Sequence, residues 1–73
     1  MEDWEQRVVD EKSELSKKII ALTTFVTTNP TFLSLDSGDR DLMWEQLSLM
    51  LNYCNVLERR IGSFSSKYFT KAH

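Results

Sequence analysis

Apolar residues in the second half of the chain recur in two helical registers. The first alternates steps of four and three residues, the heptad spacing of a packed helix seam; its members are Met43, Leu47, Met50, Cys54, Leu57 and Ile61. At about 100° per residue, a second set falls on roughly the opposite side of the same helix; it comprises Leu42, Leu49, Tyr53 and Val56. A helix with two apolar faces needs a neighbour on each. We therefore expect one face to pack within the chain and the other to hold subunits together.

A helical period also runs through the first half of the chain. Its apolar members are Trp4, Val8, Leu15, Ile19, Leu22, Phe25 and Val26. Asp3 is suited to be the N-cap, with Gln6 at the capping-box position, so a first helix is predicted over about residues 3–27. Glu11 and Lys18 interrupt this stripe. The favoured interpretation is that they are edge residues that form ion pairs; the alternative is a ligand-binding role.

The chain between the two patterns contains helix-breaking signals. Pro30 disfavours helical geometry in the residue before it, and threonines are weak helix formers, so the first helix should end before the segment 27–29 and a connector should occupy about residues 28–36. Phe32 and Leu35 are expected to tuck beneath the hairpin. Asp36 is placed to cap a second helix over about residues 37–61, which Gly62 should end.

These elements predict an all-α fold, an antiparallel helical hairpin over residues 1–62 followed by a basic aromatic tail over residues 63–73. The tail is expected to be either an arm or a third short helix. Seventy-three residues form one small domain, a size at which extra stabilisation often comes from disulfides, metals or subunits. Cys54 is the only cysteine and His73 the only histidine, which leaves assembly into a symmetric oligomer as the expected source.

Charge is distributed unevenly along the sequence. Residues 1–58 carry five Lys/Arg and eleven Asp/Glu, a balance of −6, whereas residues 59–73 carry four Lys/Arg and no acid, a balance of +4. Long nucleic acid is an unexpected partner for such an acidic body, although a small anion could bind at a local basic spot. The alternative is that the basic end only complements a helix C-terminus. The sequence also predicts no membrane span and no signal peptide.

The residues that usually carry catalysis are scarce. There is no internal histidine for a triad, no glycine-rich phosphate loop and no carboxylate cluster placed for a metal. Cys54 stands at a seam position, where a buried thiol is ordinary core. We therefore predict that the chain is not an enzyme and needs no cofactor or metal.

The order and spacing of residues over roughly 4–61 resemble a family of small tailed-phage proteins, the phage anti-CBASS cyclic-oligonucleotide sponges. The positions that carry the resemblance are Trp4, Arg7, Val8, Glu11, Leu15, Lys18, Ile19, Leu22, Phe25, Val26, Phe32, Leu35, Gln46, Leu47, Met50, Tyr53, Val56, Leu57, Arg60 and Ile61. The resemblance implies a helical hexamer in the host cytoplasm. It would bind the cyclic di- and trinucleotide messengers of bacterial immunity and sequester them uncleaved.

The same resemblance implies the binding residues. Trp4 matches an aromatic that stacks on a base, although tyrosine is more usual there, and Lys18 matches a lysine that reaches the phosphates. Arg60 matches an arginine of the trinucleotide site, with Arg59 as the fallback, and Thr23 or Thr24 corresponds to a participating threonine. The candidate ligand-binding residues are Trp4, Arg7, Lys18, Thr23, Arg59 and Arg60.

Two other functions stay open from the sequence. A helical interaction protein could bind and inhibit a host protein through the Leu49 face or the tail. A nucleic-acid accessory factor could use Arg59, Arg60, Lys67 and Lys71 together with Tyr68 and Phe69. Truncating the tail should abolish binding by such a factor, whereas a sponge should survive that truncation.

Overall fold

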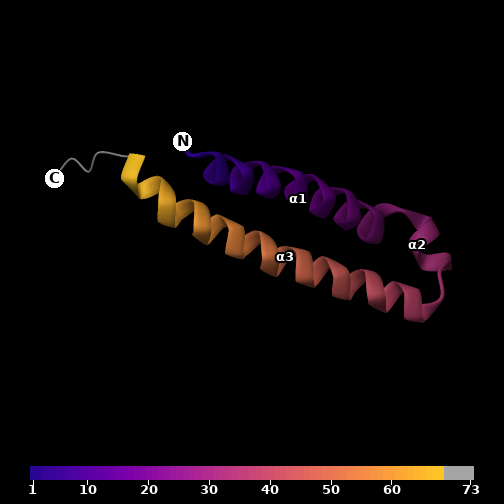
Figure 1. Cartoon of the computed structure of the whole chain (residues 1–73). Coiled ribbons are helices and arrows are strands. Elements are labelled where there is room, and N and C mark those ends of the chain that lie inside the picture. Colours follow the sequence, from indigo (N-terminus) through magenta and orange to yellow (C-terminus); the bar gives the residue numbers. More distant parts are fainter. Residues whose placement is uncertain (69–73) are drawn as a thin grey trace.

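The protein is a hairpin of two long antiparallel helices. The computed structural model describes residues 1–68. In this range the elements are α1 (Asp3–Thr28), α2 (Pro30–Ser34), α3 (Ser37–Ser65) and a single 3-10 turn, η1 (Ser66–Tyr68). The N-terminus of α1 lies beside the C-terminal end of α3, and α2 closes the opposite end (Figure 1). The predicted all-α fold with two long helices is confirmed. We call the end that holds the start of α1 and the end of α3 the free end, and the end that α2 closes the corner.

The core is a single seam between α1 and α3. Toward the free end it contains the buried residues Val8, Leu15, Leu57 and Phe64. Toward the corner it contains the buried residues Val26, Phe32 and Leu47, so Phe32 does tuck beneath the hairpin, with Leu35 packed against it. All six residues of the predicted α3 seam lie in these two clusters, and Leu57 is completely buried. The heptad pattern therefore identified the intramolecular face of α3 correctly.

The corner departs from the predicted connector. α1 continues through Thr28, one residue past the predicted range 3–27 and into the segment 27–29 that was expected to lie outside the helix. The hydroxyls of Thr27 and Thr28 donate to the carbonyl oxygens of Thr23 and Thr24, each at 2.6 Å, a bond that threonine can form inside a helix. Asn29 then adopts the extended geometry that Pro30 requires, and its side chain accepts from the Thr31 N–H at 2.9 Å to start α2.

The starts of the two long helices agree with the predicted ranges, but their caps differ in detail. α1 begins at Asp3 after the N-cap Glu2, whose N–H donates to the Glu5 carboxylate at 2.8 Å, so the predicted Asp3 cap is one residue too late. Asp36 does occupy the N-cap position of α3, but without a side-chain capping bond.

Gly62 does not end α3, because burial of Phe64, seven residues after Leu57, continues the seam by one heptad. The first part of the predicted tail is therefore helix. The tail predictions that involve Phe69, Lys71 and His73 fall outside the described residues.

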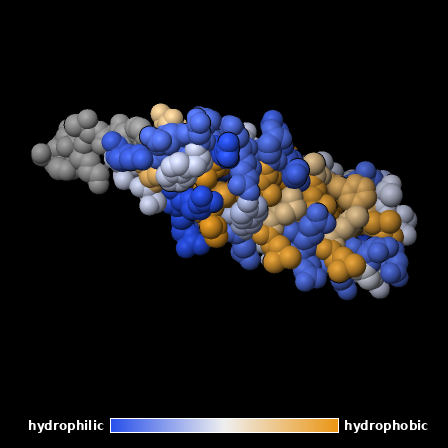
Figure 2. Space-filling model, viewed as in Figure 1, coloured by the Kyte–Doolittle hydropathy of each residue, from blue (hydrophilic) through white to orange (hydrophobic). Residues whose placement is uncertain are grey.

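The second apolar register of α3 is left uncovered in the single chain. Leu42 and Leu49 are 63% and 62% exposed, and Tyr53 and Val56 are 43% and 41% exposed. We call these four residues the α3 stripe. Apolar side chains reach the surface along the lower edge of the molecule and toward the corner, whereas the upper edge is largely hydrophilic (Figure 2). Within residues 1–68 no helix combines the length and apolar character needed to cross a membrane.

Candidate functional site

Trp4 lies at the free end with half of its side chain open to solvent. It sits in the first turn of α1 and is 49% exposed. Its ring meets the buried ring of Phe64 at a centroid distance of 5.3 Å and an interplanar angle of 77°, an edge-to-face contact. The Lys67 ammonium lies 6.0 Å from the indole centroid, within cation–π range. The indole is therefore held from the α3 side and open on the other.

A buried carboxylate supports this arrangement. The Glu5 side chain has no exposed surface, and its second oxygen, Oε2, lies 2.7 Å from Lys67 Nζ. The first oxygen accepts the N–H of Glu2 at 2.8 Å. A buried carboxylate is tolerated only when it is paired and hydrogen-bonded, and these two contacts meet that requirement. Glu5 thus ties the N-terminus of α1 to η1.

The three arginines predicted to bind ligand lie toward the same end of the molecule as Trp4. Arg7 is exposed and lines a shallow groove with Met1, Glu2, Asp3 and Trp4. Arg59 and Arg60 are exposed near the C-terminal end of α3. Because adjacent helical residues point about 100° apart, these two side chains leave the helix in different directions. Arg60 follows Val56 by four residues and Tyr53 by seven, so it continues the α3 stripe.

Lys18 lies far from Trp4 along the same helix. Fourteen residues at 1.5 Å per residue separate the two by about 21 Å. Lys18 is exposed at the edge of a shallow, mostly apolar groove on one side of the hairpin; the groove is lined by Leu15, Lys18, Ala21, Leu22, Phe25, Met43, Gln46 and Met50. One chain therefore cannot bring Trp4 and Lys18 together on a compact ligand.

Thr23 and Lys18 lie on different faces of α1. It is exposed, and five residues place it about 140° around α1 from Lys18. Its carbonyl oxygen is occupied by the Thr27 hydroxyl. The alternative, Thr24, has the same type of bond from Thr28 and lies about 120° from Lys18 in the other direction. Within one chain the six candidates thus divide into Trp4, Arg7, Arg59 and Arg60 at the free end, with Lys18 and Thr23 apart.

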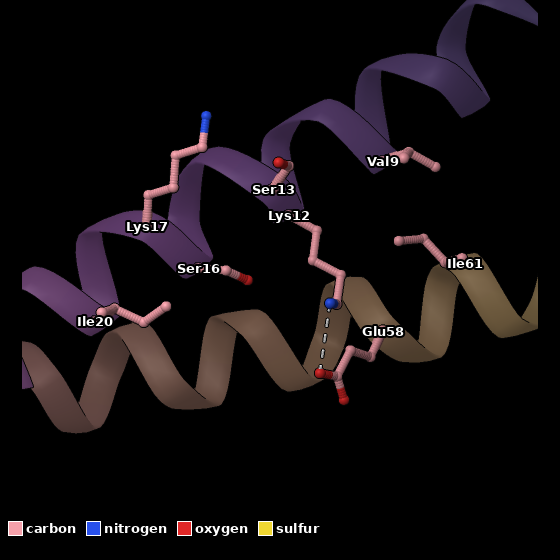
Figure 3. A pocket seen from close by; sticks show the side chains of 8 residues that line it. All are labelled: Val9, Lys12, Ser13, Ser16, Lys17, Ile20, Glu58 and Ile61. Carbon is pink, nitrogen blue, oxygen red and sulfur yellow. Dashed lines mark ion pairs between the residues drawn. The ribbon is translucent and has the colours of Figure 1, made fainter.

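A third groove lies along another flank of the hairpin and shares no lining residue with the groove beside Lys18; its side chains are drawn in Figure 3. Lys12 of α1 and Glu58 of α3 form an ion pair across it at 3.7 Å, and Val9 and Ile61 face one another beside the pair. Both charged side chains are partly exposed, so the pair adds little stability. The remaining lining residues are Ser13, Ser16, Lys17 and Ile20. None of the six predicted ligand-binding residues lines this groove.

The thiol of Cys54 lies deeper on the same flank. Its sulfur is 4.0 Å from the Ser16 hydroxyl and 4.0 Å from a Glu58 oxygen, and the side chain packs against the Leu57 cluster. This placement agrees with the seam position predicted for it. Among residues 1–68 no group of three or more His, Cys, Asp or Glu side chains is arranged to hold a metal ion.

The sequence left part of the free end unassigned. Phe64 and Lys67 contact the Trp4 ring, and Glu5 pairs with Lys67. None of the three was among the predicted cyclic-nucleotide-binding residues, although Lys67 was named for the alternative nucleic-acid factor. A signal for Phe64 existed, because it extends the series Met50 and Leu57 by another seven residues. Lys67 follows Phe64 by three residues and so falls on the same side. No pattern identified Glu5, since its burial depends on contact with a segment sixty residues away.

Chemically, the free end combines an accessible aromatic face with three arginines and one fixed lysine. An indole face can stack on a nucleobase, and guanidinium and ammonium groups can bind phosphate oxygens. The described part of the chain therefore presents groups suited to binding a small nucleotide anion.

Comparison with known proteins agrees with this chemistry. A family model described as Sequestin matches residues 2–63, most of the chain. Sequestins are the phage anti-CBASS cyclic-oligonucleotide sponges, the family that the sequence resembles. The chain matches no curated protein and no solved structure.

Proposed function

Because the chain belongs to the Sequestin family, we propose that it binds cyclic di- and trinucleotide messengers, holds them uncleaved and thereby antagonises CBASS immunity. The single observation that carries the proposal beyond family membership is the free end. There the half-exposed Trp4 lines a groove with Arg7 and meets Lys67, and Arg59 and Arg60 are exposed near the adjoining end of α3. An aromatic platform beside several cations is what a base linked to phosphates requires.

The proposed site is shared between copies of the chain. Trp4 and Lys18 are about 21 Å apart along α1, farther than one compact cyclic dinucleotide extends, so Lys18 would have to come from a neighbouring protomer. Cyclic di- and trinucleotides have near twofold and threefold symmetry, which matches sites on the axes of a symmetric oligomer. The exposed α3 stripe supplies an apolar surface for that assembly. A hexamer, as the family resemblance implies, would provide both kinds of axis.

Sequestration rather than hydrolysis is the proposed outcome of binding. The one histidine of the sequence is His73, outside the region that matches the family. The Sequestin family is a binding family rather than a family of enzymes. The proposed place of action is the host cytoplasm, where the messengers of bacterial immunity are produced.

A depletion experiment tests the proposal. The pure protein is incubated at micromolar concentration with a panel of cyclic di- and trinucleotides and filtered, and the retained fraction is heated and chromatographed. A sponge depletes the filtrate and returns the same nucleotide on denaturation. Linear products would instead identify a hydrolase. Failure to deplete any member of the panel would favour the alternative, an interaction protein that uses the α3 stripe to bind a host protein.

A further inference from the structure

The C-terminal segment reaches back to the residue that the sequence predicts to stack on a base. Phe64 in the last turn of α3 and Lys67 in η1 both contact the indole of Trp4. They are three residues apart on consecutive helical turns, so both approach the indole from the same side. The exposed half of the indole therefore faces away from α3.

Lys67 is itself fixed by a buried group. Its ammonium lies 2.7 Å from Oε2 of Glu5, a carboxylate with no exposed surface. Glu5 is in turn held by the backbone N–H of Glu2. Glu5 is the residue next to Trp4, so the carboxylate and the indole leave adjacent positions of the same helical turn and meet the same lysine.

From this geometry we infer that Glu5 and Lys67 are positioning residues for the stacking platform. The inference rests on the proposed function and adds to the ligand site Phe64 and Lys67, which were not among the predicted cyclic-nucleotide-binding residues. Lys67 and Phe64 hold the indole in one orientation before ligand arrives, so binding need not order that side chain. Glu5 acts through Lys67 and makes no contact with the ligand.

Replacing Glu5 by glutamine distinguishes a positioning role from a purely electrostatic one, because the two predict opposite changes in ligand affinity. Glu5→Gln removes a negative charge close to a site for a polyanion, so a purely electrostatic effect would tighten binding. Gln keeps the shape of the side chain and an oxygen for the Glu2 N–H, but it cannot form the ion pair. A positioning role predicts the opposite sign: binding weakens by about two- to tenfold, the factor expected when one side chain must be ordered on binding.

A second variant and a matched control complete the design. Lys67→Met keeps the length of the side chain and loses its charge, and it should weaken binding by a similar factor, whereas Lys67→Arg should restore it. Lys17→Met removes a lysine that forms an exposed ion pair with Glu14 at 3.2 Å, and so reports the effect of net charge alone. Thermal unfolding followed by circular dichroism establishes that each variant is folded.

Fluorescence supplies a readout that needs no ligand. Trp44 is replaced by phenylalanine, so that emission comes only from Trp4. In that background Glu5→Gln and Lys67→Met should make Trp4 more accessible to acrylamide quenching and lower its anisotropy, while Lys17→Met should leave both unchanged.

The outcomes separate the inference from the proposed function. If the unmodified protein depletes cyclic nucleotides but Glu5→Gln binds them equally or more tightly, with unchanged quenching of Trp4, the positioning role is overturned and the sponge stands. If the unmodified protein binds none of the panel, both fall together.

Discussion

At the scale of single residues, the two tryptophans form a natural pair for comparison. Trp4 and Trp44 are 49% and 47% exposed, and each packs edge-to-face on a buried phenylalanine, Phe64 and Phe32 respectively. They differ in place: Trp4 lies at the free end beside Lys67, whereas Trp44 lies near the corner, against Phe32 of α2. Any difference between them in ligand binding therefore reports position and not residue type.

Trp4→Ala should reduce cyclic dinucleotide affinity by about 5- to 150-fold, the effect of losing one stacked base. Trp44→Ala should leave affinity within about twofold, because it removes an indole of similar exposure that is far from Arg7, Arg59 and Arg60. Titration calorimetry on both variants, after gel filtration shows that their oligomeric state is unchanged, measures the difference. Undiminished affinity in Trp4→Ala would remove Trp4 from the site.

Side-chain pattern predicted core residues well and polar partners poorly. The six seam residues of α3 were identified because apolar period depends only on local helical geometry. Glu5 could not be identified, because a carboxylate is buried only where a distant cation, here Lys67, meets it. The roles predicted for Lys18, Thr23 and the arginines remain predictions, since they depend on a ligand and on neighbouring copies.

At the scale of elements, the C-terminal end of α3 differs most from its predicted form. Gly62 was expected to end the helix, yet none of the glycines in residues 1–68 has a positive φ angle. Local propensity was overridden by the gain from burying Phe64, which is 7% exposed. Helix-ending signals are weak when an apolar residue continues the seam beyond them.

Gly62→Ala should therefore stabilise the protein. A Cβ at this position meets nothing within 4 Å, and alanine is favoured over glycine inside a helix by about 0.5–1 kcal/mol. Chemical denaturation at a fixed protein concentration should show a higher midpoint with an unchanged slope. A lower midpoint would mean that Gly62 serves a close approach to another subunit or a helix end in solution.

The burial of Phe64 also revises where the tail can be cut. A chain ending at Ser63 loses Phe64 and should be destabilised by about 3–5 kcal/mol, the cost of removing a buried phenylalanine. A chain ending at Tyr68 keeps Phe64 and Lys67 and is the matched control. Thermal unfolding of both at equal concentration should give a much lower midpoint for the shorter chain alone. The sequence-based expectation that a sponge survives loss of residues 63–73 is thereby limited to cuts beyond the seam.

At the scale of the whole molecule, the hairpin leaves part of its apolar surface exposed to solvent. Its extents of 54 × 27 × 16 Å describe an elongated, thin body, and the α3 stripe runs along one of its sides. Arg60 continues that stripe toward the free end. Burial of the stripe against another copy would bring Arg60 of each protomer close to the interface, so assembly and ligand binding should be linked.

Leu49→Glu should dissociate the oligomer that we propose. Leu49 lies in the middle of the stripe at 62% exposure, and a carboxylate there would be buried without a partner. Sedimentation velocity should show a fall in mass together with loss of cyclic nucleotide binding. Leu33→Glu, at a 72% exposed position on α2, is the control and should change neither. A stable monomer of the unmodified protein would contradict the two-face interpretation of α3.

The two halves of the core differ in the length of chain that each must close. Val26, Phe32 and Leu47 at the corner are separated by at most 21 residues, whereas Val8 meets Phe64 across 56. The entropy cost of closing a loop grows with that length. The packing of α1 against α3 should therefore form first at the corner and last at the free end, and it should open first at the free end. The proposed ligand site is built on that end. A bound messenger should therefore hold the free end closed, and amide protons in the first turns of α1 should exchange far more slowly once ligand is bound.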